Sequence, residues 1–393
     1  MCIQHSIRNS IRKRRKGKRR HMKKAITLVI AVLMVFSIAS CGTADDVENK
    51  VKTVGIALPT KTLERWNRDG EYLRTEFENA GYAVELIYSG NDVIQQKNDI
   101  ASLIKNGVDI LIISAIDGDT LTKVLSDAKA QEIPVIAYDR LIMNTDAVSY
   151  YVSYDNYTVG ALQGQFVVNA LDLPNAGDRT YNIEFTAGDP ADNNAHYFFS
   201  GAFDILRPYI ESGTLNVVSG QTSFEQTATE QWSTSAALIR MKELLSTYYS
   251  DGTQLDVALC SNDATALGVT QAIMYDYDGD NSPLITGQDG DIANLRNIVD
   301  GIQNMTVYKN VANEAVVTLE LAKVILAGQK PAEELTDSIN IECAYDTVSY
   351  DNGTVVVPSY LLVPYVITAD NLQKLVDTGL YKWDGDYLAS TVD

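Results

Sequence analysis

Histidine is nearly missing from this sequence, with three residues in 393, and His5 and His21 lie in a basic N-terminal leader. Only His196 is then left for metal binding or acid–base chemistry, which nearly excludes multi-histidine metal sites and histidine-based mechanisms. Cysteine is also scarce, with four residues, so this is not a small domain held together by disulfides. We expect free thiols at Cys260 and Cys343, with a disulfide between them as the alternative.

Glycine-rich phosphate loops are missing as well. The first strand-like run leads into GIALPTKTLERW, which contains neither G-x-G-x-x-G nor a P-loop, so nucleotide binding is disfavoured. An acidic loop at Asp276, Asp278 and Asp280 hints at calcium. However, Asn281 and Gly287 stand where an EF-hand needs a glycine and an acid. The sequence therefore predicts no cofactor and no metal, with calcium at this loop as the alternative.

Acidic residues are absent from residues 1–40, which carry eleven Lys and Arg, whereas the other 353 residues carry 21 Lys and Arg against 51 Asp and Glu. A body this acidic repels nucleic acid and phosphate-rich partners. The charge therefore favours a neutral or cationic ligand and predicts no nucleic-acid partner. It carries no information about the fold.

Residues 1–40 have the pattern of an export signal. Met22 and two lysines precede AITLVIAVLMVFSIA at 25–39, an apolar run shorter than the roughly 20 residues that span a bilayer. The basic run RKRRKGKRR before it is either an upstream extension, with Met22 as the working start, or a nucleic-acid patch. In both cases we expect this signal leader to be removed from the mature protein.

The leader ends in Ile38-Ala39-Ser40-Cys41, which looks like a bacterial lipobox. This motif predicts cleavage before Cys41 and a diacylglyceryl group on its thiol, which would anchor the protein to the cell membrane on its extracytoplasmic side. Residues 41–51 then form a short tether that is polar and acidic. The alternative is an ordinary signal followed by a chance cysteine.

From Val51 onward, short strand-like runs alternate with amphipathic helical patterns. Continuous apolar strands separated by helices are typical of parallel sheets that are covered on both faces. The expected strands are 53–58, 83–88, 110–114, 135–138, 149–156, 182–186, 215–219, 257–260, 284–287 and 305–308. The expected helices are 63–80, 93–106, 119–132, 157–171, 193–210, 225–248, 264–275, 291–300 and 311–327.

These strands are too many for one comfortable sheet and enough for two, so we expect an α/β protein of two lobes. The first crossing between lobes is predicted near 149–156. The β-rich segment 339–358 belongs to a tail that could return to the first lobe and cross back, giving a hinge of several strands. The predicted N-terminal lobe comprises 52–156 and about 307–343, and the C-terminal lobe comprises 157–306 and about 344–393.

Polar and aromatic side chains collect where these strands end, which is where open α/β sheets bind ligands. They are carboxylates, amides, cations and indoles, without a plausible nucleophile–base pair. Each has a structural alternative: the indoles in the core, the Asp and Asn residues as helix caps, and the Arg and Lys residues in solvent. The candidate ligand-binding residues are Arg65, Trp66, Asp139, Arg140, Asn193, Asn194, Trp232, Asn262, Asp289 and Lys309, with Asp263 adjacent.

This mixture of side chains suits a neutral ligand with many hydroxyl groups. Carboxylates accept hydrogen bonds from adjacent hydroxyls, while Arg, Lys and Asn donate to hydroxyl and ring oxygens. An indole can cover the C–H face of a pyranose, and a tryptophan on each side of the ring would make a sandwich.

Eight segments carry a family resemblance: LERW (63–66), NGVDILIISAIDG (106–118), IPVIAYDRLI (133–142), DNNA (192–195), SND (261–263), TGQDGD (286–291), TVYK (306–309) and VVPSYLL (356–362). Together they resemble type I periplasmic sugar-binding proteins, similar to the D-xylose-binding and multiple-sugar-binding receptors of ABC transporters. The resemblance runs from about 54 to 378. It implies two Rossmann-like lobes with parallel sheets, joined by a three-crossover hinge, that close on a ligand without catalysis. It also implies that the ten candidate residues line the cleft.

The predicted function is a lipid-anchored extracytoplasmic binding protein, expected to be a monomer, that captures a monosaccharide of the xylose, glucose or galactose class and delivers it to an ABC permease. The alternative is a sugar-sensing module that presents the bound sugar to a chemoreceptor or sensor kinase. The lack of histidine disfavours an enzyme. A repressor is disfavoured because the export signal stands where its helix-turn-helix would be.

Overall fold

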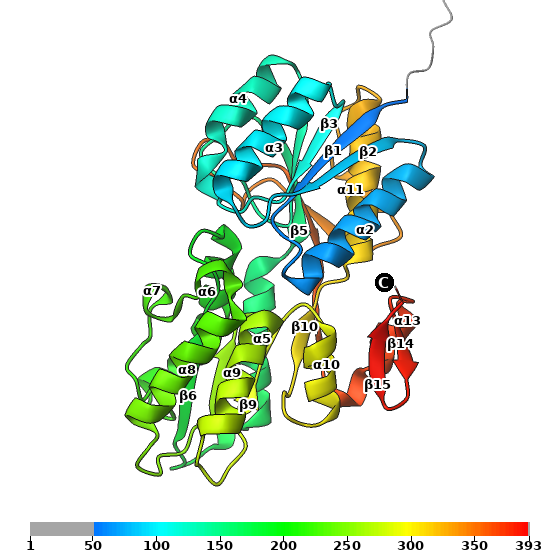
Figure 1. The fold of residues 1–393 in the computed structure, drawn as a ribbon. Coiled ribbons are helices and arrows are strands. Elements are labelled where there is room, and N and C mark those ends of the chain that lie inside the picture. Colours follow the sequence, from blue (N-terminus) through cyan, green and yellow to red (C-terminus); the bar gives the residue numbers. More distant parts are fainter. Residues whose placement is uncertain (1–50, 392–393) are drawn as a thin grey trace, which may run out of the picture. The chain divides into compact units, whose positions relative to one another are not determined.

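The computed structural model describes residues 51–391, and Lys52–Asp393 form one compact unit built on two open sheets (Figure 1). The predicted leader and Cys41 of the lipobox lie outside the described residues. No helix among the residues that the structure describes is long and apolar enough to cross a membrane.

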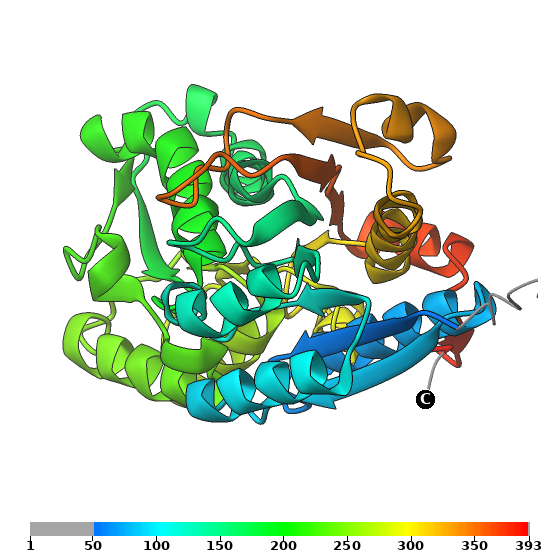
Figure 2. The ribbon, with the colours of Figure 1, turned by 90° about the horizontal axis from the view of Figure 1, so that it is seen from above.

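The first sheet has seven strands in the order β11-β12-β5-β4-β3-β1-β2. All neighbours pair in parallel except β11 and β12, which are antiparallel. The strands are β1 (Thr53–Leu58), β2 (Ala83–Tyr88), β3 (Ile110–Ile113), β4 (Val135–Tyr138), β5 (Val148–Tyr154), β11 (Cys343–Asp346) and β12 (Ser359–Leu362). Figure 2 shows the two edges of this sheet, with the blue β2 and the orange segment of β11 on opposite sides.

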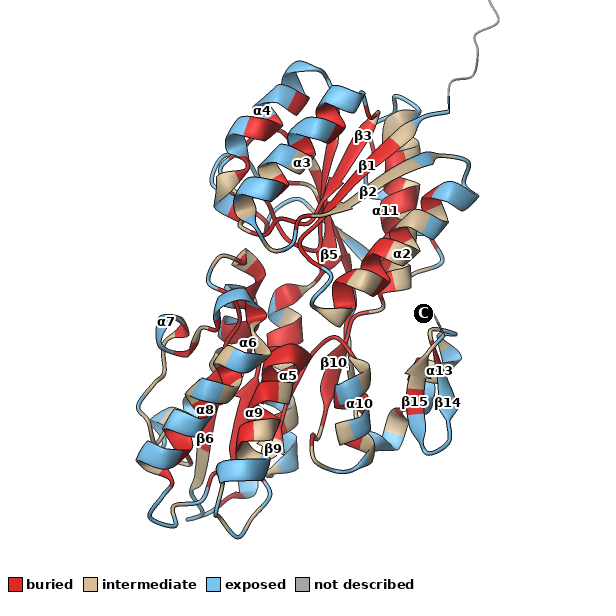
Figure 3. Ribbon diagram, viewed as in Figure 1, coloured by how far each residue is buried: buried red, intermediate tan, exposed pale blue. Residues whose placement is uncertain are grey.

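Helices cover both faces of this sheet because its strands are apolar on both faces. The helices of this first lobe are α2 (Glu64–Asn79), α3 (Val93–Asn106), α4 (Thr122–Ala130), α11 (Val311–Leu326) and the short α12 (Glu334–Ser338), with the 3₁₀ turn η1 (Gly118–Thr120). Ile112 of β3 packs in one buried cluster with Phe77 of α2. Its neighbours Leu111 and Ile113 point the other way and pack with Leu103 of α3. Figure 3 shows that buried residues are concentrated in the sheet and in the helix faces turned toward it.

The second sheet is smaller, with parallel strands in the order β7-β6-β8-β9. Its strands are β6 (Tyr181–Thr186), β7 (Leu215–Asn216), β8 (Val257–Cys260) and β9 (Leu284–Ile285). The strand β10 (Thr306–Tyr308) joins it through a bridge between Val307 and Gln288, and pairs antiparallel with β13 (Tyr365–Ile367). The helices of this second lobe are α5 (Asn156–Ala170), α6 (Asn193–Glu211), α7 (Phe224–Thr227), α8 (Thr234–Tyr248), α9 (Asp263–Asp276) and α10 (Ile292–Val299), with the 3₁₀ turns η2 (Leu173–Asn175) and η3 (Glu230–Trp232).

A hairpin of β14 (Tyr381–Asp384) and β15 (Tyr387–Ser390) follows the turn η4 (Ala369–Asn371) and the short helix α13 (Gln373–Asp377). It packs beside α10 (Figure 1). Tyr381 and Leu388 of the hairpin share a buried cluster with Leu295 and Ile298 of α10. The end of the chain is thus attached to the second lobe.

The chain passes between the two sheets three times: after β5, after β10 and after β12. The predicted α/β class, with two lobes of parallel sheet joined by three crossovers, is confirmed. Two boundaries are wrong, however, because Ser359–Leu362 pair with Tyr151–Tyr154 in the first sheet, and β10 pairs with β13 and bridges to Gln288. Residues 344–362 therefore belong to the first lobe, and β10 at 306–308 belongs to the second. Apolar alternation identifies strands but does not reveal which sheet a returning strand joins.

The predicted helix 225–248 is also wrong, since the structure breaks it into α7, η3 and α8. Gln231 and Trp232 have left-handed backbone conformations, with φ of 56° and 53°. The chain then restarts as α8, whose first turn is capped by Ser233 through its Oγ and the N–H of Ala236. This break directs Trp232 against Gly188, where a Cβ atom would lie 2.0 Å from the indole ring.

Candidate functional site

A narrow cavity lies where the strand ends of the two lobes meet, and its empty space together with the adjoining open solvent is about 400 Å³. Its first-lobe residues follow β1 and β4, and its second-lobe residues follow β6, β8 and β9 or lie in η3; Lys309 follows β10 at the crossover. The lining residues are Leu63, Arg65, Trp66, Asp139, Arg140, Asp192, Phe198, Trp232, Asn262, Ala264, Gln288, Asp289, Asp291 and Lys309.

The structure brings eight of the ten predicted residues to this cavity: Arg65, Trp66, Asp139, Arg140, Trp232, Asn262, Asp289 and Lys309. Asn193 and Asn194 are not among its lining residues. Asn194 is buried and instead donates to the backbone oxygen of Asp139 at 2.6 Å, so it connects the second lobe to the first. The adjacent Asp263 accepts from the backbone N–H of Asp291 at 2.9 Å and from Thr306 Oγ1 at 3.1 Å.

Sequence reasoning missed six lining residues: Leu63, Asp192, Phe198, Ala264, Gln288 and Asp291. Among these six residues, Asp192 had the clearest signal in the sequence, because it lies between the end of a strand and the predicted site residue Asn193. It caps α6 through one oxygen, and its Oδ2 accepts from Trp232 Nε1 at 3.3 Å. Arg140 Nε lies 3.0 Å from the same oxygen. Phe198 gave no signal, since an apolar residue on a helix predicts only burial.

Three lining residues are held in left-handed backbone conformations. The φ angles are 59° for Asp139, 53° for Trp232 and 103° for Asp289. Such conformations are unfavourable for residues other than glycine and concentrate at functional sites, where surrounding contacts hold them. Around Asp139, Tyr151 and Ser153 donate to its backbone oxygen at 2.6 and 2.9 Å. Backbone and side-chain contacts therefore aim this carboxylate into the cavity.

Arg65 is the centre of the charged network in the cavity. Its guanidinium forms ion pairs with four carboxylates: one on its own helix α2, two that follow strands, and one on α11. These partners are Asp69 at 3.2 Å, Asp289 at 3.3 Å, Glu314 at 3.3 Å, and Asp139. Asp289 comes from the second lobe, so Arg65 connects the two lobes inside the cavity. A planar guanidinium with five donors suits such a position.

Lys309 adds a second cation to this network. Its Nζ lies 3.5 Å from Asp139 Oδ2 and 3.3 Å from Asp289 Oδ1, and 5.4 Å from the ring centre of Phe198. Burial alone would raise the pKa of Asp139, but the charges of Arg65, Lys309 and Arg140 lower it to about 2. Asp139 is therefore an ionised acceptor at any physiological pH.

Carboxylates outnumber cations in the lining, with Asp139, Asp192, Asp289 and Asp291 against Arg65, Arg140 and Lys309. All three cations already face a carboxylate of the protein. An anionic ligand would have to displace the carboxylates from these pairs. The electrostatics instead suit a neutral ligand whose hydroxyl groups donate to the carboxylates and accept from the cations.

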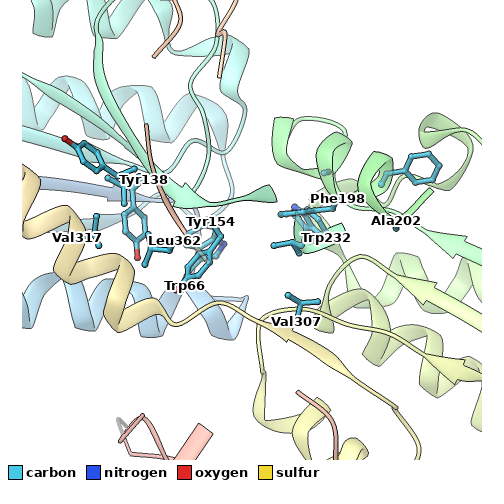
Figure 4. Packing of buried hydrophobic residues seen from close by; sticks show 14 of the residues in the cluster. Trp66, Tyr138, Tyr154, Phe198, Ala202, Trp232, Val307, Val317 and Leu362 are labelled. Atoms are coloured by element: carbon cyan, nitrogen blue, oxygen red, sulfur yellow. The ribbon is translucent and has the colours of Figure 1, made fainter. Parts of the chain in front are cut away.

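Two indoles approach the cavity from different lobes (Figure 4). Trp66 of α2 lies beneath two guanidinium groups, with the Cζ atoms of Arg65 and Arg140 each 5.2 Å from its ring centre. Trp232 meets Phe198 at a ring-centre distance of 6.2 Å and an interplanar angle of 60°. Apolar ring surface thus lies beside a dense set of polar groups, as amphipathic ligands require.

Metal and thiol chemistry find no support in the described part of the chain. No group of three or more His, Cys, Asp and Glu side chains there could hold a metal ion, and Asp276 of the acidic loop pairs with Lys242 at 3.2 Å. Cys260 and Cys343 are free thiols on strands of different sheets. His196 is exposed on α6 and packs on Phe224 at a ring-centre distance of 3.9 Å.

The two lobes and the polar cavity between their strand ends define a binding protein for a small solute. The chain belongs to the periplasmic binding protein family, whose domain model matches residues 54–330. It is 40% identical to the multiple sugar-binding periplasmic receptor ChvE of Rhizobium radiobacter, over 84% of this chain and 91% of that protein. It is 32% identical to the D-xylose-binding periplasmic protein of Escherichia coli, over 82% and 88%.

A solved structure of an ABC transporter solute-binding protein from Clostridium phytofermentans, with bound β-D-glucose, is also similar. It is 46% identical, with a TM-score of 0.79, and the match covers 84% of this chain and 98% of that one. These relatives confirm the predicted family resemblance. The chain is accordingly a binding receptor and not an enzyme.

Proposed function

We propose that this protein is an extracytoplasmic receptor for a neutral monosaccharide of the glucose and xylose class, which it delivers to an ABC permease. The observation that carries the proposal is the cavity, where one indole from each lobe lies beside Asp139, Asp289, Arg65 and Lys309. The relatives support the ligand class, because their names and titles give multiple sugars, D-xylose and β-D-glucose.

The arrangement suits a sugar ring for a geometric reason. A pyranose presents hydroxyls around its rim and C–H groups on its faces. Carboxylates and cations bind the rim, while indole surface covers a face without leaving a polar group unpaired. Because the partners come from both lobes, a bound ring forms all of its hydrogen bonds only when the lobes meet, so the ligand favours that arrangement.

Calorimetric titration of the mature protein against a panel of aldoses tests this proposal. We expect D-glucose or D-xylose to bind reversibly with Kd on the order of 1 μM, or about −8 kcal/mol. Glucuronate is the matched anionic control, since it adds a carboxylate to the same ring and should bind much more weakly. Failure of every aldose to bind or to raise the melting temperature would contradict the proposal.

The proposal includes a lipid anchor at Cys41, which lies outside the described residues and rests on the lipobox pattern alone. Cys41→Ala should release the protein from the membrane or stall its processing. Fractionation and mass spectrometry of the N-terminus provide the measurement, with Cys2→Ala as the control. Membrane retention in Cys41→Ala, with no lipid on Cys41 in the wild type, would refute the anchor.

A further inference from the structure

A second group of charged residues connects the lobes outside the cavity. Glu64 and Arg68 lie four residues apart on α2, and Arg68 Nη1 donates to Glu64 Oε1 at 3.0 Å. Neither residue lines the cavity. Both nevertheless contact the second lobe, in the segment between β9 and α10.

Arg68 binds the backbone of that segment directly. Its Nη2 donates to the carbonyl oxygen of Asp289 at 3.0 Å, and its Nη1 donates to that of Gly290 at 3.2 Å. Nη2 also lies 3.0 Å from Asp291 Oδ1. Arg68 is only 8% exposed, so these contacts form in a nearly dry environment, where charge-assisted hydrogen bonds are strong.

Glu64 supplies the capping carboxylate that α10 lacks in its own sequence. The helix begins after Asp291, whose side chain makes no capping hydrogen bond, and its first turn has no acidic residue. The N–H of Ile292 lies 3.3 Å from both carboxylate oxygens of Glu64. A carboxylate of the first lobe therefore caps a helix of the second, and separating the lobes would leave this helix end to water.

The two lobe contacts meet at Asp289. Its carboxylate faces Arg65 and Lys309 in the cavity, while its backbone carbonyl is held by Arg68 from outside. The residue keeps a φ of 103°, a conformation that needs support from its surroundings. Arg68 thus holds the backbone that aims a cavity carboxylate.

We propose that Glu64 and Arg68 form a clasp that stabilises the sugar-bound arrangement of the lobes and positions Asp289, so that the clasp sets how fast the sugar is released. This inference rests on the proposed function, because it concerns the closing of the same site. Arg68 is a positioning residue in this account, since it acts on the ligand through Asp289 and through lobe contact.

Stopped-flow tryptophan fluorescence of the mature protein with D-glucose provides the kinetic test. Arg68→Gln should raise the release rate about 5- to 50-fold and change the association rate by less than about threefold, because the clasp stabilises the closed lobes and does not contact the entering sugar. The release rate of Arg68→Lys should lie between those of the wild type and Arg68→Gln, since an ammonium keeps the charge but not the planar set of donors of a guanidinium. Glu64→Gln should have a smaller effect of the same sign.

Arg74→Gln is the matched control. Arg74 lies on the same helix and pairs with Glu71 of that helix, at 3.4 Å and in partial exposure to solvent. Its release rate should equal that of the wild type. A release rate in Arg68→Gln and Glu64→Gln equal to that of Arg74→Gln would overturn the clasp.

Small-angle scattering of the sugar-free proteins separates failure of the clasp from failure of the proposed function. With no sugar present, Arg68→Gln should still have a larger radius of gyration than the wild type and Arg74→Gln, because the lobes lose a contact. If no aldose binds the wild type, the proposed sugar-binding function is wrong, and this comparison of the sugar-free proteins alone tests the clasp. Equal radii in the three proteins would then overturn it.

Discussion

Arg65 and Arg68 lie three residues apart on α2 and make different kinds of contact. Arg65 pairs with carboxylate side chains around the cavity, and only Asp289 among these comes from the second lobe. Arg68 pairs within its own helix and then with carbonyl oxygens and a carboxylate of the second lobe. One helix therefore carries a residue placed to touch a ligand and a residue placed to hold the lobes together.

The comparison teaches that affinity in this protein has two physical sources. Contacts that a ligand makes with the cavity residues disappear when it leaves. Contacts of the clasp depend only on the meeting of the lobes and are available with or without a ligand. Substitutions that separate these sources should change different measured quantities.

The largest effect is expected at Asp289, which both arginines contact. Asp289→Ala removes the carboxylate from the cavity, which should leave sugar hydroxyls without a partner in a dry site and Lys309 with Asp139 as its remaining carboxylate partner. This should weaken sugar binding by roughly 2–4 kcal/mol, or about 30- to 1,000-fold, in calorimetric titration. Unliganded stability should change little. Asp146→Ala is the control, because Asp146 forms an exposed pair with Lys129 outside the site; affinity equal to that control would remove Asp289 from the site.

A smaller effect is expected at Trp66, on which the cavity arginines stack. Trp66→Ala removes ring surface that would cover one face of the sugar, and should cost about 1–3 kcal/mol, or about 5- to 150-fold in affinity. The clasp does not involve Trp66, so the radius of gyration of the sugar-free protein should not change. Trp383→Ala serves as the control, because Trp383 is exposed on β14 and does not line the cavity. Equal sugar affinity in the two variants would contradict stacking on Trp66.

The smallest effect is expected at Asp291, the carboxylate of the second lobe that faces Arg68. Burial raises the pKa of Asp291 to about 7, whereas an unfolded chain has a value of about 3.9. The folded protein therefore holds this proton more tightly, and the contribution of Asp291 to the free energy of unfolding declines as pH rises from about 4 to about 7. Asp291→Asn keeps an acceptor for Arg68 and removes the titration.

Melting temperatures measured from pH 4 to pH 8 provide the check. Other buried carboxyls with raised pKa values, such as Asp263 and Glu314, give the wild type a slope of the same sign. The difference between wild type and Asp291→Asn isolates Asp291, and the variant should lose less stability across this range. If the melting temperature changes equally with pH in the wild type and in Asp291→Asn, Asp291 does not titrate as described.

The sequence predicts the alternating elements well because they depend on local pattern. β1, β2, β4 and β8 have the predicted bounds, since each is a short apolar run between turn residues. The return of β12 to the first sheet could not be predicted, because pairing with β5 is a property of the fold. The break before α8 was equally hidden, since Gln231 and Trp232 give no local signal for left-handed conformations.

The cavity was predictable where a residue lies close behind a strand, as Asp139 does after β4 and Asp289 does after the predicted strand 284–287. It was not predictable where a side chain that follows a strand forms a hydrogen bond with another part of the protein instead of lining the cavity. Asn194 follows a strand too, yet its amide is used by the backbone of Asp139. Arg68 could not be found at all, because its partners are carbonyl oxygens that are more than 200 residues away along the chain.

The most direct test of the account is small-angle scattering of the mature wild-type protein, free and saturated with an aldose that binds in calorimetry. The account holds that a sugar touching Asp139 of one lobe and Asp289 of the other binds most tightly when the lobes meet. It predicts that the radius of gyration falls on saturation, and that it falls less in Asp289→Ala at equal occupancy. A radius that stays the same when the wild type is saturated would contradict the account.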